Sequence, residues 1–298
     1  MDKVVAEVVD ILVQTQEDLK VYIKNKVTPN ISGDGFMIYA KGDTKAPKPM
    51  LCVHLDTINT HQAALEHPID IGKNYYYDEN LKVLGLTPKT SLACLGGDDR
   101  AGVWIALAMI DYMEASGDYK YDIGFFNDEE IGCHGSTAYK KTIHKPNTTC
   151  YIGLDRKSTQ GEQEVALYGD DNKELIKIFT DLGYPVDMGS ITDASNLSGV
   201  LACVNLSVGY DNEHTPREVL YLKCMLDTLE NLKKAEFEPE MYPVTFDYFY
   251  DTNIWGDTTG AESGYLSDLE EENIILREAL EALKVDVDTL LIDAYYDA

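Results

Sequence analysis

The chain is poor in basic residues and has no long apolar run. Its 298 residues carry 25 lysines and arginines against 52 acidic residues, a formal net charge of −27. A chain this acidic repels phosphate backbones and anionic lipid surfaces, so neither nucleic acid nor a membrane is expected as a partner. No segment reaches the roughly 18 apolar residues of a membrane helix. The first residues, with Lys3, Glu7 and Asp10, lack the pattern of a secretory leader, so we expect a cytoplasmic protein.

Cysteine pairs at metal-binding spacing are also missing. The six cysteines show no Cys-x-x-Cys spacing, which argues against a cysteine-ligated zinc site and against a disulfide framework. Most of them fall in apolar runs and are expected to be small buried side chains. Cys94 and Cys133 lie near polar motifs and are expected to pack beside them. The histidines without a motif context are expected at the surface; they are His61, His67, His134 and His144.

Apolar periodicity predicts an α/β fold. Helical spacing predicts an amphipathic helix at the start of the chain, over residues 1–13, and a buried helix that opens at Asp98. Further helices are predicted over 172–182 and 216–234. Strands are predicted over 36–40, 50–55, 121–126, 149–154, 165–168 and 201–208. This alternation indicates a three-layer αβα sandwich around a mixed, mostly parallel sheet, followed by a C-terminal helical tail.

Histidines and carboxylates stand where the predicted strands end. All but one of these residues lie at or just past the carboxyl end of a strand, and Asp98 opens a helix instead. They are His54, Asp98, Glu129, Glu130, Asp155 and His214. In open α/β sheets, ligands collect outside the carboxyl ends of the strands. These side chains are therefore expected to converge.

The types of these side chains suit zinc chemistry. Imidazole and carboxylate are zinc ligands, and two zinc ions about 3.5–4 Å apart share a ligand in hydrolytic sites. Each motif has a plain alternative when taken alone, because Asp98-Asp99 can cap a helix and Glu129-Glu130 can be a solvated pair. Asp56 lies two residues after His54, on the same side of a strand, and so can fix the tautomer of the imidazole.

Together these stretches resemble the co-catalytic di-zinc exopeptidases, the superfamily of bacterial leucyl aminopeptidase, peptidase T, glutamate carboxypeptidase and acyl-amino-acid deacylases. The motifs that carry the resemblance are Asp98-Asp99-Arg100-Ala101-Gly102 and Asp128-Glu129-Glu130-Ile131-Gly132. The resemblance covers about residues 1–235. It implies a zinc-dependent hydrolase that acts on a peptide or an acyl-amino-acid substrate.

The resemblance also implies roles for single residues. One zinc ion would be held by His54, Asp98 and Asp155, and a second by Asp98, Glu130 and His214, with Co²⁺ or Mn²⁺ as alternatives to zinc. Glu129 would be the general base, and Asp56 would orient His54. The peptide bond after the bridging aspartate, Asp98–Asp99, is expected to be cis.

Two short spacings separate this chain from larger relatives. Asp155 and Asp193 lie only 38 residues apart and His54 and Asp98 only 44, which leaves no room for an inserted lid or assembly domain. The leading hypothesis is therefore a single-domain exopeptidase, an aminopeptidase. The alternatives are a deacylase or amidohydrolase with the same site and a non-catalytic binding protein. A binuclear phosphoesterase is disfavoured, because the chain has His54-x-Asp56 where that chemistry uses Asp-x-His, and it has no Gly-Asn-His.

The chain changes in character after Lys234. We expect a catalytic domain over residues 1–236, a loop-rich strap over 237–262 and an acidic helical tail over 263–298. Leucines and other residues at a and d spacing predict a coiled coil in the tail, with Asn273 at an a position. The tail would then provide homo-oligomerisation. The alternative, a helix that lies back on its own domain, stays open.

Overall fold

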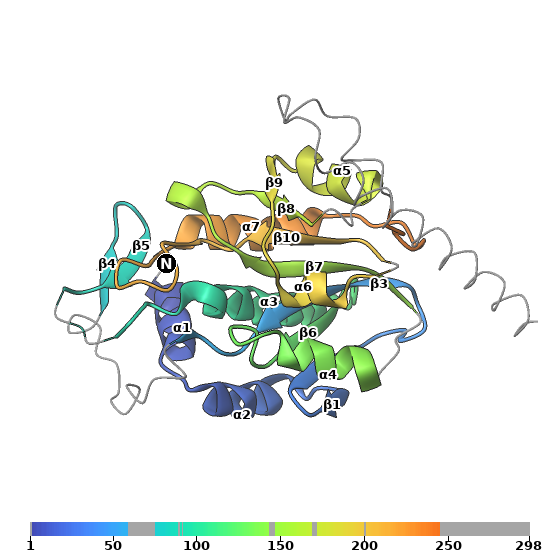
Figure 1. The fold of residues 1–298 in the computed structure, drawn as a ribbon, viewed down its shortest axis with the longest axis horizontal. Coiled ribbons are helices and arrows are strands. Elements are labelled where there is room, and N and C mark those ends of the chain that lie inside the picture. Colours follow the sequence, from blue (N-terminus) through green and yellow to red (C-terminus); the bar gives the residue numbers. More distant parts are fainter. Residues whose placement is uncertain are drawn as a thin grey trace, which may run out of the picture. The chain divides into compact units, whose positions relative to one another are not determined.

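An eight-stranded mixed sheet forms the centre of the protein (Figure 1). The computed structural model describes residues 2–58, 75–88, 90, 92–142, 147–168, 172–199 and 201–244. In spatial order the strands are β1 (Ile31–Gly33), β2 (Phe36–Tyr39), β6 (Asp122–Phe126), β3 (Lys48–His54), β7 (Thr148–Arg156), β10 (Cys203–Ser207), β8 (Val165–Leu167) and β9 (Val186–Met188). The four central strands, β6, β3, β7 and β10, are mutually parallel, so their carboxyl ends share one edge.

Helices cover both faces of this sheet, and alternate side chains of the strands divide between them (Figure 1). On β3, Leu51 and Val53 face one core, whereas Met50 and Cys52 face the other. The first core is closed by α1 (Asp2–Leu12), α2 (Gln16–Val27), α3 (Gly97–Ser116), α5 (Lys173–Asp181) and α7 (Leu222–Lys234). The second is closed by α4 (His134–Thr142) and α6 (Asp193–Leu197). The predicted three-layer sandwich is therefore confirmed.

A second, four-stranded antiparallel sheet was not predicted. Its order is β11 (Tyr210–Asp211), β12 (Val219–Tyr221), β5 (Val83–Leu86) and β4 (Tyr75–Asp78). It corrects one prediction, since the helix expected over 216–234 begins only at Leu222. Residues 219–221 are extended because they pair with β5, and this pairing outweighs the helical spacing that continues into α7.

The other predicted elements agree with the structure to within a few residues. Asn172 caps α5, because its side chain accepts hydrogen bonds from the N–H groups of Glu174 and Leu175 at 3.1 and 3.2 Å. Helix α2, with 12 residues, was missed, as were the shorter elements α4, β1 and β9. All six cysteines are buried and free, as expected. None of the helices within the described ranges is long and apolar enough to cross a bilayer.

Only the start of the predicted strap falls within the described residues. Tyr242 is buried in the first core and its ring lies 6.4 Å from that of Phe237, which also contacts Tyr121. The backbone of Tyr242 bonds to Thr149 and Ala202 at 2.9 and 2.8 Å. This part therefore packs on the main sheet. The predicted tail, residues 263–298, lies outside the described residues.

Candidate metal centre

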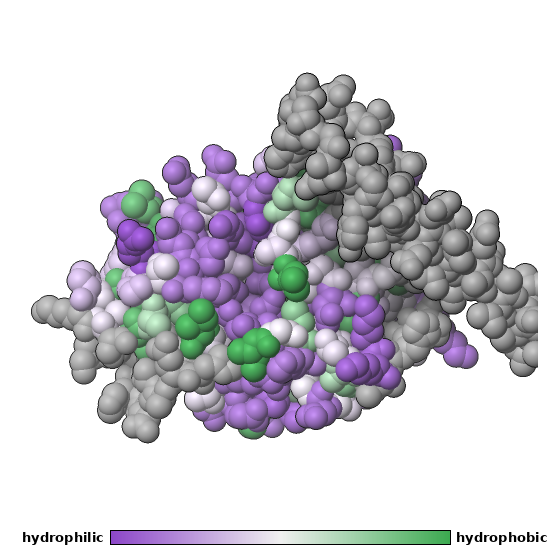
Figure 2. Space-filling view, viewed as in Figure 1, coloured by the Kyte–Doolittle hydropathy of each residue, from purple (hydrophilic) through white to green (hydrophobic). Residues whose placement is uncertain are grey.

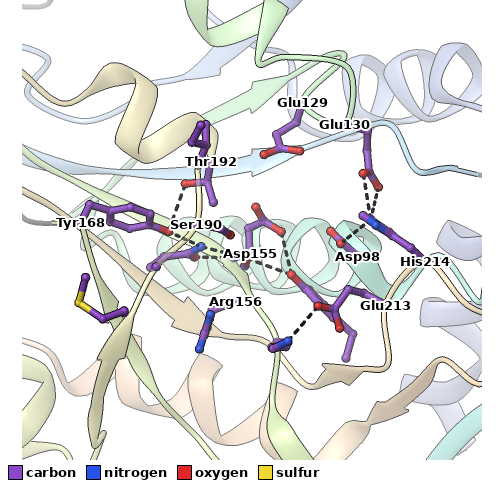
Figure 3. A pocket seen from close by; sticks show the side chains of 16 residues that line it. Asp98, Glu129, Glu130, Asp155, Arg156, Tyr168, Ser190, Thr192, Glu213 and His214 are labelled. Carbon is purple, nitrogen blue, oxygen red and sulfur yellow. Dashed lines mark hydrogen bonds and ion pairs between the residues drawn. The ribbon is translucent and has the colours of Figure 1, made fainter.

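The predicted site residues meet at the carboxyl edge of the parallel strands. His54 ends β3, Asp155 is the next-to-last residue of β7, and Glu129 and Glu130 follow β6. Asp98 lies in the first turn of α3, and His214 follows β11. A pocket of about 430 Å³ opens here and is lined by all of them except His54 (Figure 3). The side chain of His54 is buried.

Asp98 lies between the two imidazoles. Its Oδ1 is 3.1 Å from His54 Nε2, and its Oδ2 is 3.1 Å from His214 Nε2. Burial alone raises the pKa of Asp98, but the hydrogen bonds to His214 and His54 outweigh it and hold this pKa below its usual value. One carboxylate therefore offers one oxygen to each side of the site.

Each imidazole faces a second carboxylate as well. His214 Nε2 lies 2.9 Å from an oxygen of Glu130, and His54 Nε2 lies 3.5 Å from Asp155 Oδ1. Two sets of potential ligands thus form around Asp98, and the set of Asp98, Glu130 and His214 lies within the reach of one metal ion.

By distance alone, Asp99 could replace Asp98 in the ligand set that contains His54. His54, Asp99 and Asp155 also lie within reach of one ion. Both oxygens of Asp99 are already engaged, however: Oδ2 accepts from the N–H of His54 at 3.2 Å and Oδ1 from that of Gly102 at 3.0 Å. We therefore take Asp98 as the candidate ligand. The Asp98–Asp99 peptide bond is cis, which confirms the expectation from the resemblance.

Gly102 explains the glycine of the Asp-Asp-Arg-Ala-Gly motif. A Cβ atom there would lie 2.0 Å from the carbonyl oxygen of Leu154 and 2.3 Å from Asp99 Oδ1. Only a residue without a side chain lets α3 approach β7 this closely. The close approach sets Asp98 and Asp99 beside the end of β7, where Asp155 lies.

Asp56 connects the two halves of the site. Its Oδ1 lies 3.3 Å from His54 Nδ1 and accepts from the N–H of Glu129 at 3.0 Å, while its Oδ2 accepts from the N–H of Glu130 at 3.1 Å. Burial acts to raise the pKa of Asp56, but these contacts outweigh it and lower the pKa to about 2. The backbone carbonyl oxygen of Asp56 also lies 3.1 Å from His54 Nδ1, so both groups of Asp56 are placed to orient His54. The carboxylate in addition fixes the turn that carries Glu129 and Glu130.

Glu129 differs from the other carboxylates. Its side chain faces the pocket across from Asp155 (Figure 3). Burial, reinforced by Asp98 and Glu130, raises the pKa of Glu129 to about 7. The Sγ atom of Cys133 lies 3.9 Å from Glu129 Oε1, in agreement with the prediction that Cys133 packs beside the site. A carboxyl group with this pKa can both accept and release a proton near neutral pH.

Three positioning residues were missed by sequence reasoning. Glu218 accepts from the N–H groups of Gly96 and Asp98 at 2.9 and 3.1 Å. Asn205 bonds to both backbone groups of Asp155, and the hydroxyl of Tyr210 donates to its carbonyl oxygen at 3.0 Å. Local patterns carry no signal for these contacts, because they join residues 50 or more positions apart.

The donor set fits divalent metal, because its carboxylate and imidazole groups are metal ligands. Carboxylates crowd this small volume, and burial raises the pKa of Asp155 and of Asp99, as expected for acids that lack enough opposing charge. The guanidinium of Arg100 is buried and interacts electrostatically with Asp56 and Asp99, but Arg100 is not among the residues that line the pocket. His134 is exposed, as predicted, and His61, His67 and His144 lie outside the described residues.

A mixed αβα sheet with imidazoles and carboxylates gathered at its carboxyl edge defines a metal-dependent hydrolase. The model of peptidase family M28 matches residues 38–201, and the chain belongs to this family. It is therefore a hydrolase that acts on peptides, of the metallo-exopeptidase class, as the motifs predicted. No curated protein sequence matches the chain.

Solved structures support the same fold. Aminopeptidase PepT from Bacillus cereus has a TM-score of 0.57 at 14% identity, with 78% of this chain and 96% of that chain covered. A tripeptidase from Staphylococcus aureus has a TM-score of 0.56 at 12% identity, covering 78% and 98%. An aminopeptidase from the archaeon Desulfurococcus kamchatkensis has a TM-score of 0.54 at 14% identity, covering 85% and 99%. At such identities the likeness is one of fold.

Proposed function

We propose that the protein is an aminopeptidase with two zinc ions in its site. His54, Asp98 and Asp155 would hold one ion, and Asp98, Glu130 and His214 the other. The observation that carries the proposal is the position of Asp98, whose two oxygens each lie 3.1 Å from a different imidazole. A carboxylate placed in this way is suited to bridge two ions.

Bound zinc would supply a water of lowered pKa and a Lewis acid for the scissile carbonyl. The residues of the chain do the rest. Glu129, which faces the pocket and is not a proposed ligand, would take the proton of the attacking water and pass it to the leaving amine. Asp56 keeps His54 in one tautomer and, through the N–H of Glu129, keeps the base facing the pocket.

Two observations support cleavage at the amino end. The structural relatives include two aminopeptidases, from Bacillus cereus and Desulfurococcus kamchatkensis. Carboxylates that face the pocket, Glu129 and Glu213 among them, can also accept hydrogen bonds from the ammonium group of a peptide. Within the described residues, the stretch between Asp155 and α6 holds only short elements, so no lid domain closes over the pocket there.

The direct test is hydrolysis by zinc-loaded enzyme of three substrate sets: amino-acid amides, N-acyl amino acids and short peptides. Cleavage of amides and of peptides from the amino end is the expected result. Preference for N-acyl amino acids would replace the aminopeptidase proposal with a deacylase. Binding of peptides without turnover by metal-loaded protein would indicate a binding protein that has kept the fold.

A further inference from the structure

The pocket wall opposite Glu130 and His214 has a surplus of hydrogen-bond donors. It is formed by Arg156 at the end of β7, Tyr168 after β8 and Ser190 after β9 (Figure 3). None of these residues belongs to the candidate ligands or to the proton-transfer residues described above. They therefore represent a part of the pocket whose purpose the metal chemistry does not explain.

The hydroxyl of Tyr168 is the clearest case. The Oδ1 atom of Asn205 accepts from the N–H of Asp155 at 2.8 Å, so its Nδ2 atom must be the donor to Tyr168 Oη at 3.0 Å. The hydroxyl of Thr192 also donates to Tyr168 Oη, at 3.5 Å. The Tyr168 oxygen thus accepts from Asn205 and Thr192, so its hydroxyl group is free to direct its own proton into the pocket.

The other two residues also keep free donors. Arg156 engages Glu164 and Asp187 through Nε and Nη2 only, so Nη1 has no partner in the described part of the chain. Ser190 is exposed, and its hydroxyl makes no hydrogen bond within that part either. The wall therefore presents donors from three separate elements of the fold.

The chain before Ser190 packs closely on Tyr168. A Cβ atom at Gly189 would lie 2.5 Å from the ring of Tyr168, so the chain before Ser190 packs directly on that ring because it has no side chain there. Burial raises the pKa of Tyr168, which keeps its hydroxyl protonated at neutral pH. A donor fixed in this way loses little entropy when it binds an acceptor.

Local charge decides which acceptor fits. Arg156 is paired with both Glu164 and Asp187, so this group of three carries a net charge of −1, and Lys157 is neutralised by Glu213 at 3.2 Å. A carboxylate on the substrate would meet this negative charge. A neutral carbonyl oxygen would accept the same hydrogen bonds without repulsion.

We infer that Tyr168, Ser190 and Arg156 form a subsite that binds a neutral carbonyl oxygen of the substrate, away from the scissile bond. The inference rests on the proposed peptidase function. The carbonyl can come from the next peptide unit of the substrate or from a side-chain carboxamide. Both sources offer the same acceptor, and substrate design separates them.

The test compares matched substrates in the zinc-loaded full chain. Leucyl-glycinamide adds a backbone carbonyl to leucinamide, glutaminamide adds a side-chain carboxamide, and glutamic acid α-amide carries an anion in its place. The variants are Tyr168→Phe and Ser190→Ala, with Tyr76→Phe, an exposed tyrosine of β4 outside the pocket, as the control. Zinc content is measured for each, because Tyr168→Phe removes one acceptor of Asn205.

In the wild type, the substrate whose carbonyl reaches the wall should have a KM about 3–10-fold below that of leucinamide, the effect of one or two neutral hydrogen bonds. Tyr168→Phe and Ser190→Ala should reduce the ratio of the KM of leucinamide to the KM of that substrate, whereas Tyr76→Phe should leave this ratio unchanged. The same ratio in all four proteins would overturn the inference. A lower KM for glutamic acid α-amide than for glutaminamide would overturn the choice of a neutral acceptor.

A binding measurement separates this inference from the proposed function. Dissociation constants of the same amides are measured by calorimetry in zinc-loaded Glu129→Gln protein and its Tyr168→Phe double variant. A lower dissociation constant for amides with the additional carbonyl, lost in the Tyr168→Phe double variant, supports the subsite. This holds even if the wild type shows no turnover, and in that case only the peptidase proposal fails. Equal dissociation constants for amides with and without the carbonyl would overturn the subsite.

Discussion

Glu218 accepts a hydrogen bond from the N–H group of Asp98 at 3.1 Å, although the two residues are 120 positions apart in the chain. Its other oxygen accepts from Gly96 at 2.9 Å. Because Glu218 follows His214 by four residues, one loop both supplies a candidate ligand and fixes the residue that would bridge the ions. Burial raises the pKa of Glu218 to about 8.

The variant Glu218→Gln should therefore weaken metal binding without removing a ligand. One amide oxygen replaces two acceptor oxygens, and the amide N–H group faces a backbone donor. Changes of this kind beside a metal site typically cost about 10–100-fold in metal affinity or activity. Competition with a chelating dye measures the zinc affinity. Glu174→Gln, at an exposed carboxylate of α5 outside the pocket, is the control, and equal zinc affinity for Glu218→Gln and wild type would contradict the assigned role.

Glu129→Gln should separate catalysis from metal binding. The amide keeps the size of the side chain but cannot take a proton, so turnover should fall by a factor of about 10²–10⁴ or more. Metal content should stay at the wild-type level, because Glu129 is not among the proposed ligands. Steady-state kinetics and elemental analysis of the same preparation check both points. Near-normal turnover would remove Glu129 from the role of base.

Asp98→Ala should affect both metal positions at once, because the proposed bridge has one oxygen at each. We expect the variant to lose metal from both and to be inactive. In the wild type, chelation should abolish hydrolysis and added Zn²⁺ or Co²⁺ should restore it. Elemental analysis is the measurement, and a fully active wild type with only one tightly bound ion per chain would rule out the paired site.

The carboxylate of Glu114 should give a pH-dependent contribution to stability far from the metal centre. It accepts hydrogen bonds from Lys41 at 2.5 Å and from Tyr39 at 2.6 Å, which tie β2 to the end of α3. The hydrogen bond from Lys41, with that from Tyr39, lowers the pKa of Glu114 to about 2. A lowered folded-state pKa stabilises the fold above the unfolded value, and this contribution is lost as the pH falls towards 2.

Urea unfolding at several pH values tests this expectation. Wild type should be more stable than Glu114→Gln at pH 7, and the difference should shrink between about pH 4.5 and pH 2. Since the site is exposed, the difference should be small and should decrease with added salt. Asp34→Asn, another exposed carboxylate, is the control. A difference that stays constant with pH would show that the contact acts through packing alone.

We predict that the acidic tail, residues 263–298, mediates homo-oligomerisation. Deletion of residues 263–298 should convert an oligomer to a monomer if the heptad pattern forms a coiled coil. Light scattering of the full-length and shortened proteins measures this. If both are monomers, the tail does not mediate association, and the helix has another function. Zinc content and amide hydrolysis should be the same in both, because none of the proposed ligands lies in the tail.

The order of residues along the chain was enough to predict the class of fold and the candidate site residues. Alternating apolar runs predicted the strands, and the ends of those strands carry His54, Asp155 and the Glu129-Glu130 pair. This succeeded because side-chain periodicity is a local property, and because parallel strands bring their carboxyl ends to one edge whatever the detail of the loops.

Only the tertiary structure decided which groups hold these residues in place. Asp56 was expected to orient His54, but its bonds to the N–H groups 73 and 74 positions further on have no local signal. The same is true of Glu218. Local spacing does not predict the small sheet, and it wrongly extends the last helix over 219–221, because the extended state of β12 depends on pairing with distant β5. Contacts between separate segments form only when the chain has folded, so a local pattern cannot record them.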